Sequence, residues 1–440
     1  MPESVSESQY FARSVAQLGA DRPMQTVKPV YGAHGIKILE KGAKLTPGLY
    51  ERLVQHHPTT PLEDSVEIDA AVNGKNLRAA GEELLNRTPV LARMADRTLL
   101  LDCLEAVPLP TAIVFQLTVV RDVHPEQFRY FVATALITVW LANRPQATRK
   151  ELVLAAAAGL LHDLGMMHID PVLLQPRTKI SREQRRQLYS HPLVSVLLLE
   201  RHTEYPPEML RAIREHHEVL DGSGYPGGLS GNAISPWGRI LSLAQVVAAL
   251  VKPGRSHAAL RLSVLLRTNR HRFDAPLVDR LLPLLQQMAE ENTEPGGIDN
   301  PVPDPVGSLL RIQQALLDWP AALALDAKLT AARRNGLAFI GDRCARILRT
   351  LVESGASSEQ LQNLDQDAIT GLLADELSLI TRELAWQLRA LQRETRRRWS
   401  LAANEQLPEA LAQWIDQVEA ACTGLIHHGS AEAAPADAGA

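Results

Sequence analysis

The sequence predicts an all-α protein of more than one domain, with a small α/β unit near its N-terminus. Leu, Ala and Arg are abundant, whereas aromatic residues make up only 4% of the chain, a bias that favours helices over sheets. The chain of 440 residues is too long for one ordinary hydrophobic core. Apolar stretches with the length or spacing of helices lie at 126–143, 150–162 and 373–391.

The composition narrows the class of protein. A formal net charge of −4 gives no overall attraction to nucleic acid or acidic lipid. Cys103, Cys344 and Cys422 are too few and too far apart for a disulfide framework or a thiolate metal site, which fits a reducing cytoplasm. No apolar run reaches membrane-spanning length, and the first residues lack a basic segment followed by an apolar one. We therefore expect a cytoplasmic protein without membrane or nucleic-acid partners.

The N-terminal part of the chain predicts two segments. Residues 1–27 are polar, and we expect them to form a disordered tail. Residues 28–75 predict a small α/β unit, in which the β-branched residues around Gly32 and Gly35 indicate a hairpin.

The rest of the chain is expected to be helical. Residues 76–293 predict one helical domain with its core near 110–290, and the Pro- and Gly-rich residues 294–306 indicate a linker. Residues 307–428 predict a C-terminal helical domain that suits an output or dimerising module, and residues 429–440 predict a disordered tail. Within the first helical domain we expect helices at 126–143, 150–162, 181–202, 207–217 and 236–251.

His162 and Asp163 directly follow the apolar run LAAAAGLL, so both are expected to be buried. A buried carboxylate is costly unless it is paired or ligates a cation. A metal would account for both residues, because imidazole supplies a nitrogen ligand and a carboxylate can bridge two cations about 4 Å apart, as in two-metal hydrolases. Taken alone, however, such a His-Asp doublet is usually a hydrogen-bonded structural pair.

Three further histidines lie downstream. His191 precedes Pro192 and, taken alone, is as ambiguous as the doublet. His216 and His217 are consecutive and stand before a glycine-rich turn, and both can face one site only if a helix ends there. Mixed nitrogen and oxygen ligands of this kind suit iron, manganese or zinc.

Residues 221–226, DGSGYP, have the composition of a tight turn. Gly222 and Gly224 permit positive φ, and Pro226 restricts the exit from the turn. Beside a metal site such a turn can bring backbone N–H groups to a phosphate. A turn without any role in ligand binding fits the same residues.

These motifs resemble the HD-GYP family, bacterial phosphodiesterases of the messenger cyclic di-GMP, over about residues 110–290. The resemblance implies an all-α HD-type helical bundle, with metal held among the helices and cyclic di-GMP lying across them. It is carried by HDLG at 162–165, SREQ at 181–184, HP at 191–192, HHEVLDGSGYP at 216–226, RILSLA at 239–244 and FDAPLV at 273–278.

By this resemblance, His162 and Asp163 match the HD doublet, and His191, His216 and His217 match the three downstream histidines. All five are candidate metal ligands, and Asp163 is also the candidate catalytic residue. The family's turn shapes the substrate side and can contact diguanylate cyclase (GGDEF) domains. That role would fall on Asp221, Gly222, Gly224, Tyr225 and Pro226.

Three positions depart from the family pattern. Tyr130 stands where an early metal-binding histidine is expected, four residues after Glu126, which matches a family carboxylate and is a further candidate ligand. Gln245 replaces the final aspartate, and Met166 replaces a lysine that would meet a phosphate. A protonated phenol is a poor ligand, and the amide oxygen of glutamine carries no charge.

The ligands left intact suffice for one divalent ion rather than two, and we favour iron or manganese, with zinc also compatible. Because a two-metal site stabilises both the attacking and the leaving oxygen, we expect weak or absent hydrolysis. The preferred hypothesis is a degenerate HD-GYP signalling protein that binds a GGDEF-type or other signalling partner, with the C-terminal helices as a candidate homodimer interface. The alternatives are an active phosphodiesterase that cuts cyclic di-GMP to pGpG or GMP, and a nucleotide sensor that binds without cutting.

Overall fold

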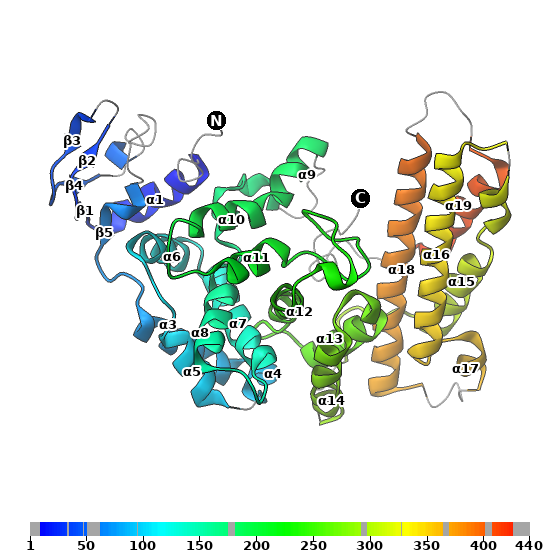
Figure 1. Ribbon diagram of the computed structural model, residues 1–440. Helices are drawn as coiled ribbons and strands as arrows, with labels where there is room; N and C mark the ends of the chain where they lie inside the picture. Colours follow the sequence, from blue (N-terminus) through cyan, green and yellow to red (C-terminus); the bar gives the residue numbers. More distant parts are fainter. Residues whose placement is uncertain are drawn as a thin grey trace. The chain divides into compact units, whose positions relative to one another are not determined.

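The computed structural model describes residues 9–32, 35–46, 48–50, 62–94, 96–174, 181–291, 297–326, 328–363, 369–400 and 407–425. Contacts divide the chain into two compact units, Met1–Gly254 and Arg255–Ala440. Helices dominate both units, so the predicted all-α class is confirmed (Figure 1). In the part of the chain that is described, no helix is both long and apolar enough to cross a bilayer.

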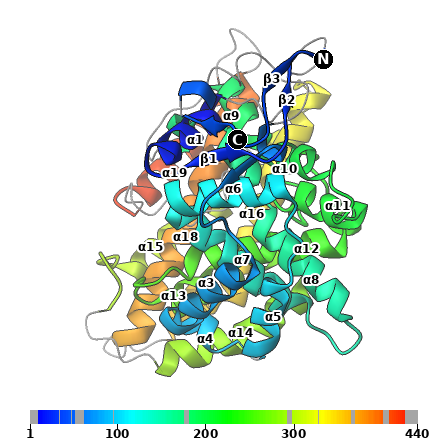
Figure 2. The same ribbon diagram turned by 90° about the vertical axis from the view of Figure 1, so that its left-hand side faces the viewer.

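The first unit begins with the expected small α/β arrangement, which Figure 2 views with the strands toward the reader. Strand β1 pairs antiparallel with β4 and β5, so that Met24 lies opposite Leu45 and Ile68. Strands β2 and β3 form the predicted hairpin. The elements are α1 (Gln9–Asp21), β1 (Met24–Thr26), β2 (Val30–Tyr31), β3 (Lys37–Leu39), β4 (Lys44–Leu45), η3 (Leu62–Asp64) and β5 (Val66–Ile68).

The expected disordered tail at 1–27 is wrong for residues 9–26, which form α1 and β1; residues 1–8 lie outside the described residues. Phe11, Val15 and Leu18 share one face of α1 and are buried. Phe11 packs edge-on against Phe115 of α6 (Thr111–Val123), with ring centroids 6.1 Å apart. The spacing of four and three residues between Phe11, Val15 and Leu18 gives α1 one continuous apolar face, which packs on the rest of the first unit.

The rest of the first unit is a helical bundle in which α7 and α8 pack closely. A Cβ atom at Gly159 of α8 would lie 2.6 Å from Cα of Ala135 in α7. The small residues of the Ala-rich stretch thus allow the close contact between these helices. The elements are α3 (Gly74–Arg87), α4 (Pro89–Ala92), α5 (Arg97–Glu105), α6, α7 (Pro125–Ala142), α8 (Arg149–Leu161), η4 (Leu164–His168), η5 (Pro171–Leu174), α9 (Arg182–Tyr189), α10 (His191–Leu199), α11 (Pro207–Glu215), η6 (Gly231–Ala233) and α12 (Pro236–Leu250).

In the second unit, all the regular elements among the described residues are helices, and α16 and α18 lie side by side (Figure 1). Trp319 and Trp414 meet edge to face in its core, with ring centroids 4.7 Å apart. Asn269 donates a hydrogen bond of 2.7 Å to Glu383, which ties the end of α13 to α18. The elements are α13 (Ala258–Thr268), η7 (Arg270–Arg272), α14 (Ala275–Glu291), α15 (Pro305–Leu317), η8 (Ala321–Leu325), α16 (Ala331–Glu353), α17 (Ser358–Gln362), α18 (Gly371–Ser400) and α19 (Glu409–Cys422).

The division after Gly254 groups α13 and α14 with the C-terminal helices, whereas the sequence assigned both to the first helical domain. The stretch expected to be a linker, 294–306, packs against α18 in its described part, because the backbone N–H of Val302 donates to Oγ of Ser378 at 2.7 Å. The extent of the functional domain to residue 293 stays a prediction, as does the C-terminal tail at 429–440, which lies outside the described residues.

Candidate metal centre

The upstream candidate ligands lie where α8 ends. His162 is the residue that caps the C-terminus of α8, and Asp163 precedes the 3₁₀ helix η4. The chain leaves its helical path at this point, so adjacent side chains can approach one site from different directions. His162 is fully buried, and Asp163 is 7% exposed. The burial expected from the preceding apolar run is therefore present for both.

The downstream histidines also lie at helix ends. The predicted helix over 181–202 is two helices, since Ser190 separates α9 from α10. His191 is the first residue of α10, and Pro192 in its first turn suits a helix start because it needs no hydrogen-bond acceptor there. His216 caps the C-terminus of α11, so His217 leaves the helix and can face the same side.

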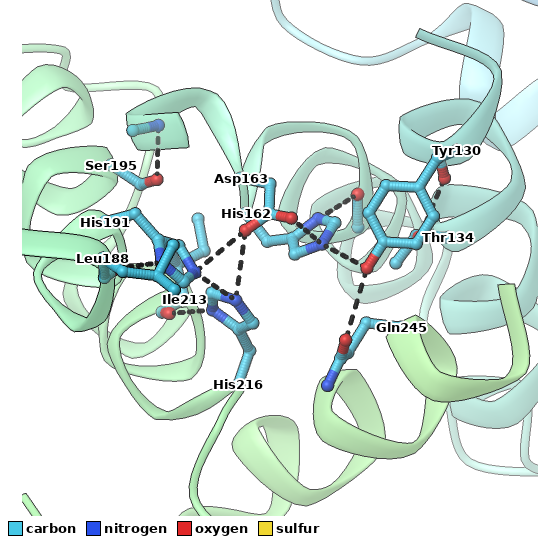
Figure 3. Close-up of polar contacts among 12 residues, drawn as sticks. Tyr130, Thr134, His162, Asp163, Leu188, His191, Ser195, Ile213, His216 and Gln245 are labelled. Carbon is cyan, nitrogen blue, oxygen red and sulfur yellow. Dashed lines mark hydrogen bonds and ion pairs between the residues drawn. The ribbon is translucent and has the colours of Figure 1, made fainter. Parts of the chain in front are cut away.

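Four of these side chains converge, and Figure 3 shows three of them, Asp163, His191 and His216. Oδ1 of Asp163 lies 3.2 Å from Nε2 of His191 and 3.3 Å from Nε2 of His216. The two Nε2 atoms are 3.4 Å apart. A nitrogen of His217 completes a group in which all ligand atoms lie within 4.8 Å of one another. Neighbouring ligand atoms around one cation are separated by roughly 3.0–3.4 Å when metal–ligand bonds are about 2.1 Å long, so the spacing suits a single ion.

The hydrogen bonds of the imidazoles fix which nitrogen faces the centre. Nδ1 of His191 donates to the carbonyl oxygen of Leu188 at 2.7 Å, and Nδ1 of His216 donates to that of Ile213 at 2.6 Å. Since Nδ1 carries the proton in each ring, Nε2 presents a lone pair toward Asp163. Oδ1 of Asp163 is correspondingly buried without a hydrogen-bond donor among the described residues.

Oδ1 of Asp163 and the Nε2 atoms of His191 and His216 are thus three buried acceptors that face one another. This arrangement is unfavourable unless a cation lies among them. Burial lowers the pKa of His217 well below its usual value, with His216 adding to the effect, so the ring is neutral and able to ligate. The residues therefore fit a divalent metal. Such an ion, when bound, supplies Lewis acidity toward a phosphoryl oxygen.

The side chains that lie near Oδ2 of Asp163, those of His162, Tyr130 and Gln245, are uncharged. His162 points its Nε2 to within 3.4 Å of Oδ2 of Asp163 and 3.4 Å of the Tyr130 hydroxyl, while its Nδ1 donates to Gly159 at 2.8 Å. The Tyr130 hydroxyl donates to Oε1 of Gln245 at 3.3 Å (Figure 3). Burial raises the pKa of Tyr130 well above its usual value, so the phenol keeps its proton. Burial likewise lowers the pKa of His162, to about 4.

Glu126 does not belong to this centre, which corrects the expectation that it is a ligand. Its side chain is 83% exposed and forms an ion pair with Arg129 one turn further along α7. An acidic residue in the first turn of a helix is stabilised by the helix dipole, which gives Glu126 a local role at the surface. Met166, the third substituted position, is half-buried within η4.

The turn at 221–226 packs directly on the histidine pair. Oδ1 of Asp221 accepts hydrogen bonds from the backbone N–H of Ser223 at 2.9 Å and from its hydroxyl at 2.6 Å. Gly222 has a φ of +76°, and a Cβ atom at Gly224 would lie 2.4 Å from the carbonyl oxygen of His217. Both glycines are therefore required by the backbone. Pro226 follows a cis peptide bond.

Two further residues hold the backbone around the site and were not predicted from the sequence. Glu218 is buried and accepts hydrogen bonds from the backbone N–H groups of Gly227 and Leu229, at 2.6 and 2.8 Å, which hold the chain beyond the turn. The Ser195 hydroxyl accepts from the N–H of Gly165 at 2.8 Å and ties α10 to the start of η4. Glu218 directly follows the histidine pair among apolar residues, a position that could have indicated a buried, partnered carboxylate.

Comparison with known proteins supports an HD-type helical fold for the part of the chain that holds this site. Residues 128–277 match the family model of the HD domain. A probable cyclic di-GMP phosphodiesterase of Vibrio cholerae is 30% identical over 46% of this chain and 46% of its own length. The cyclic di-GMP phosphodiesterase response regulator RpfG of Xanthomonas campestris is 34% identical over 32% of this chain and 39% of its own length.

A solved structure of an HDG"Y"P protein from Bdellovibrio bacteriovorus covers 61% of this chain and 98% of its own, with 16% identity and a TM-score of 0.34. The chain spans less than half the length of the curated relatives it matches. The matched part includes every residue of the metal cluster. Residues 128–277 are therefore an HD domain, and the curated relatives that match this chain are named as cyclic di-GMP phosphodiesterases.

Proposed function

We propose that this HD domain is a cyclic di-GMP signalling module that holds one divalent metal ion and hydrolyses the nucleotide weakly or not at all. One observation carries the proposal. Asp163, His191, His216 and His217 form a complete ligand group on one side, whereas the other side ends in the neutral hydrogen bond between Tyr130 and Gln245. Iron or manganese are the favoured ions, and zinc is also compatible with these ligands.

Weak hydrolysis follows from the charges that are missing. Cleaving a phosphodiester requires stabilisation of both the attacking and the leaving oxygen, which two cations supply in binuclear sites. Tyr130 and Gln245 carry no negative charge that would hold a second cation, and Met166 supplies no positive charge for a phosphate. Asp163 would hold the single ion and orient the reacting groups, which suffices for binding a phosphate and supports little turnover.

The turn at 221–226 gives the proposed module its nucleotide side. The backbone of Gly224 lies against His217 and the Tyr225 ring stacks on the His217 ring, which supports a role beside the metal cluster for Asp221, Gly222, Gly224, Tyr225 and Pro226. We propose that these residues shape the surface that meets cyclic di-GMP or a GGDEF-type partner. The second unit would serve as the output or dimerising module.

An active phosphodiesterase is the second candidate, and the position of His162 favours it. Nε2 of His162 lies 3.4 Å from Oδ2 of Asp163, the carboxylate oxygen turned away from the main ligand group. A second cation bridged by Asp163 would find one imidazole there. Glu126 gives this candidate no support, because it faces solvent.

Metal analysis of the purified protein beside a cyclic di-GMP turnover assay separates the two candidates. We expect about one ion per chain and no turnover above that of His216→Ala. The triple variant Tyr130→His, Met166→Lys and Gln245→Asp is expected to bind two ions and gain hydrolysis. Two ions with turnover in the parent protein would establish the active enzyme instead. Two ions without turnover in the triple variant would show that the substitutions do not explain the inactivity.

A further inference from the structure

His217 differs from the other histidines of the cluster in how its ring is held. His162, His191 and His216 each donate an Nδ1 hydrogen bond to a backbone carbonyl three residues earlier. Within the described residues, the His217 ring makes no hydrogen bond of this kind. A ligating imidazole usually needs a second contact that fixes its orientation, so something other than a hydrogen bond must position His217.

An aromatic stack supplies that contact. The Tyr225 ring lies over the His217 ring, with centroids 4.5 Å apart and planes inclined by 18°. Tyr189 covers the opposite face of Tyr225, with centroids 4.0 Å apart and planes inclined by 7°. The Tyr225 hydroxyl is buried and has no hydrogen-bond partner among the described residues. Tyr225 is therefore held by its ring faces rather than by its hydroxyl.

Tyr189 is placed to act on the metal cluster through the Tyr225 ring. It is the last residue of α9, a helix whose described residues are all exposed or half-buried, and it stands two positions before His191. The Tyr225 ring also meets His191 edge to face, with centroids 6.1 Å apart. The absence of a side chain at Gly224 lets the turn approach His217 closely enough for this stack to form.

We propose that Tyr189 is a positioning residue that orients the metal ligand His217 by clamping Tyr225 against it. The proposal rests on the metal site of the proposed function. The contact surfaces of the stack are ring faces, so a phenyl ring at 189 would serve as well as a phenol. An aliphatic side chain would leave Tyr225 free to tilt and His217 free to turn away.

Cobalt(II) binding tests this proposal without any need for turnover. The visible absorption of bound cobalt(II) reports its coordination, and changing a residue that orients a ligand typically weakens metal binding about 10–100-fold. We expect Tyr189→Leu to weaken cobalt(II) affinity at least about tenfold and to shift the spectrum toward that of His217→Ala. Tyr189→Phe should match the parent protein in both respects.

Two controls separate positioning from general destabilisation. Tyr205→Leu removes another tyrosine of the same unit, one that is buried and donates to Pro108 at 2.8 Å, and should lower the unfolding temperature without changing cobalt(II) binding. In a His217→Ala background, Tyr189→Leu should weaken binding no further, because the ligand it orients is gone.

The possible failures are distinguishable. If the parent protein binds cobalt(II) and Tyr189→Leu binds it with unchanged affinity and spectrum, the positioning role is overturned while the metal site stands. An additive effect of Tyr189→Leu on top of His217→Ala would overturn it as well. If the parent itself fails to bind cobalt(II), the metal site is refuted and this proposal falls with it.

Discussion

The phenol oxygen of Tyr130 lies 3.3 Å from Oε1 of Gln245, although the two residues are 115 positions apart in the chain. Tyr130 comes from α7 and Gln245 from α12, and both face the side of Asp163 that is turned away from His191 and His216 (Figure 3). Each replaces a residue that the HD-GYP resemblance leads one to expect as a ligand. Their hydrogen bond makes the two substitutions one structural unit, since each satisfies the polar group of the other.

Removing the Tyr130 hydroxyl should affect stability and leave metal binding unchanged. In Tyr130→Phe, Oε1 of Gln245 loses its donor, and we expect the free energy of unfolding to fall by about 1 kcal/mol. The metal content should equal that of the parent, because a protonated phenol is not needed as a ligand. Urea unfolding and metal analysis measure the two quantities, with Tyr205→Phe as the matched loss of a buried tyrosine hydrogen bond. Loss of metal in Tyr130→Phe would mean that the phenol coordinates the ion.

Asp163→Asn should stabilise the protein when no metal is bound and make it less stable than the parent when metal is present. In chelator-treated protein the substitution removes a buried acceptor without a donor, and we expect a gain of about 1–3 kcal/mol. In metal-loaded protein the variant should lack the stabilisation that metal gives the parent. Asp122→Asn is the control, because Asp122 pairs with Arg22 at 3.1 Å and should respond equally with and without chelator. If the metal-free Asp163→Asn protein is less stable than the metal-free parent, the inference that the Asp163 carboxylate lacks a compensating donor is wrong.

Gly224→Ala should disturb the turn and the ligand behind it. The new methyl group would lie 2.4 Å from the carbonyl oxygen of His217 and 2.6 Å from Cα of Glu218, so backbone must move. We expect a loss of about 1–3 kcal/mol in unfolding free energy together with weaker metal binding. Gly48→Ala is the matched control, because nothing lies within 4 Å of its Cβ position. Normal stability in Gly224→Ala would argue against the close approach of the turn.

Phe11→Ala tests the order of the N-terminal segment. Phe11 is fully buried and packs on both Phe115 and His168. The substitution should therefore lower the free energy of unfolding of the region that contains α1 by about 3–5 kcal/mol. Limited proteolysis should then cut within residues 9–26, whereas the exposed control Gln17→Ala should resist as the parent does. Equal resistance of Phe11→Ala and the parent would show that this packing contributes little.

The sequence by itself determined the helical class, the hairpin near Gly32 and the motifs that gather at the metal cluster. These are local properties, because composition, spacing of apolar residues and helix-end signals act over a few neighbouring positions. His191, His216 and Asp163 could be named from the chain because their motifs occur together in an order that resembles the HD-GYP pattern, although Asp163 and His191 are ambiguous alone.

Only the tertiary structure decided the features that depend on contacts between distant segments. Glu126 is exposed and lies outside the ligand group that the packed helices bring together, and Phe11 in the N-terminal segment packs on Phe115 of α6. The pairing of Tyr130 with Gln245 and the stacking of Tyr189 on Tyr225 likewise join separate helices and loops. Such contacts depend on how packed elements approach one another, which the spacing of residues along a single chain does not specify.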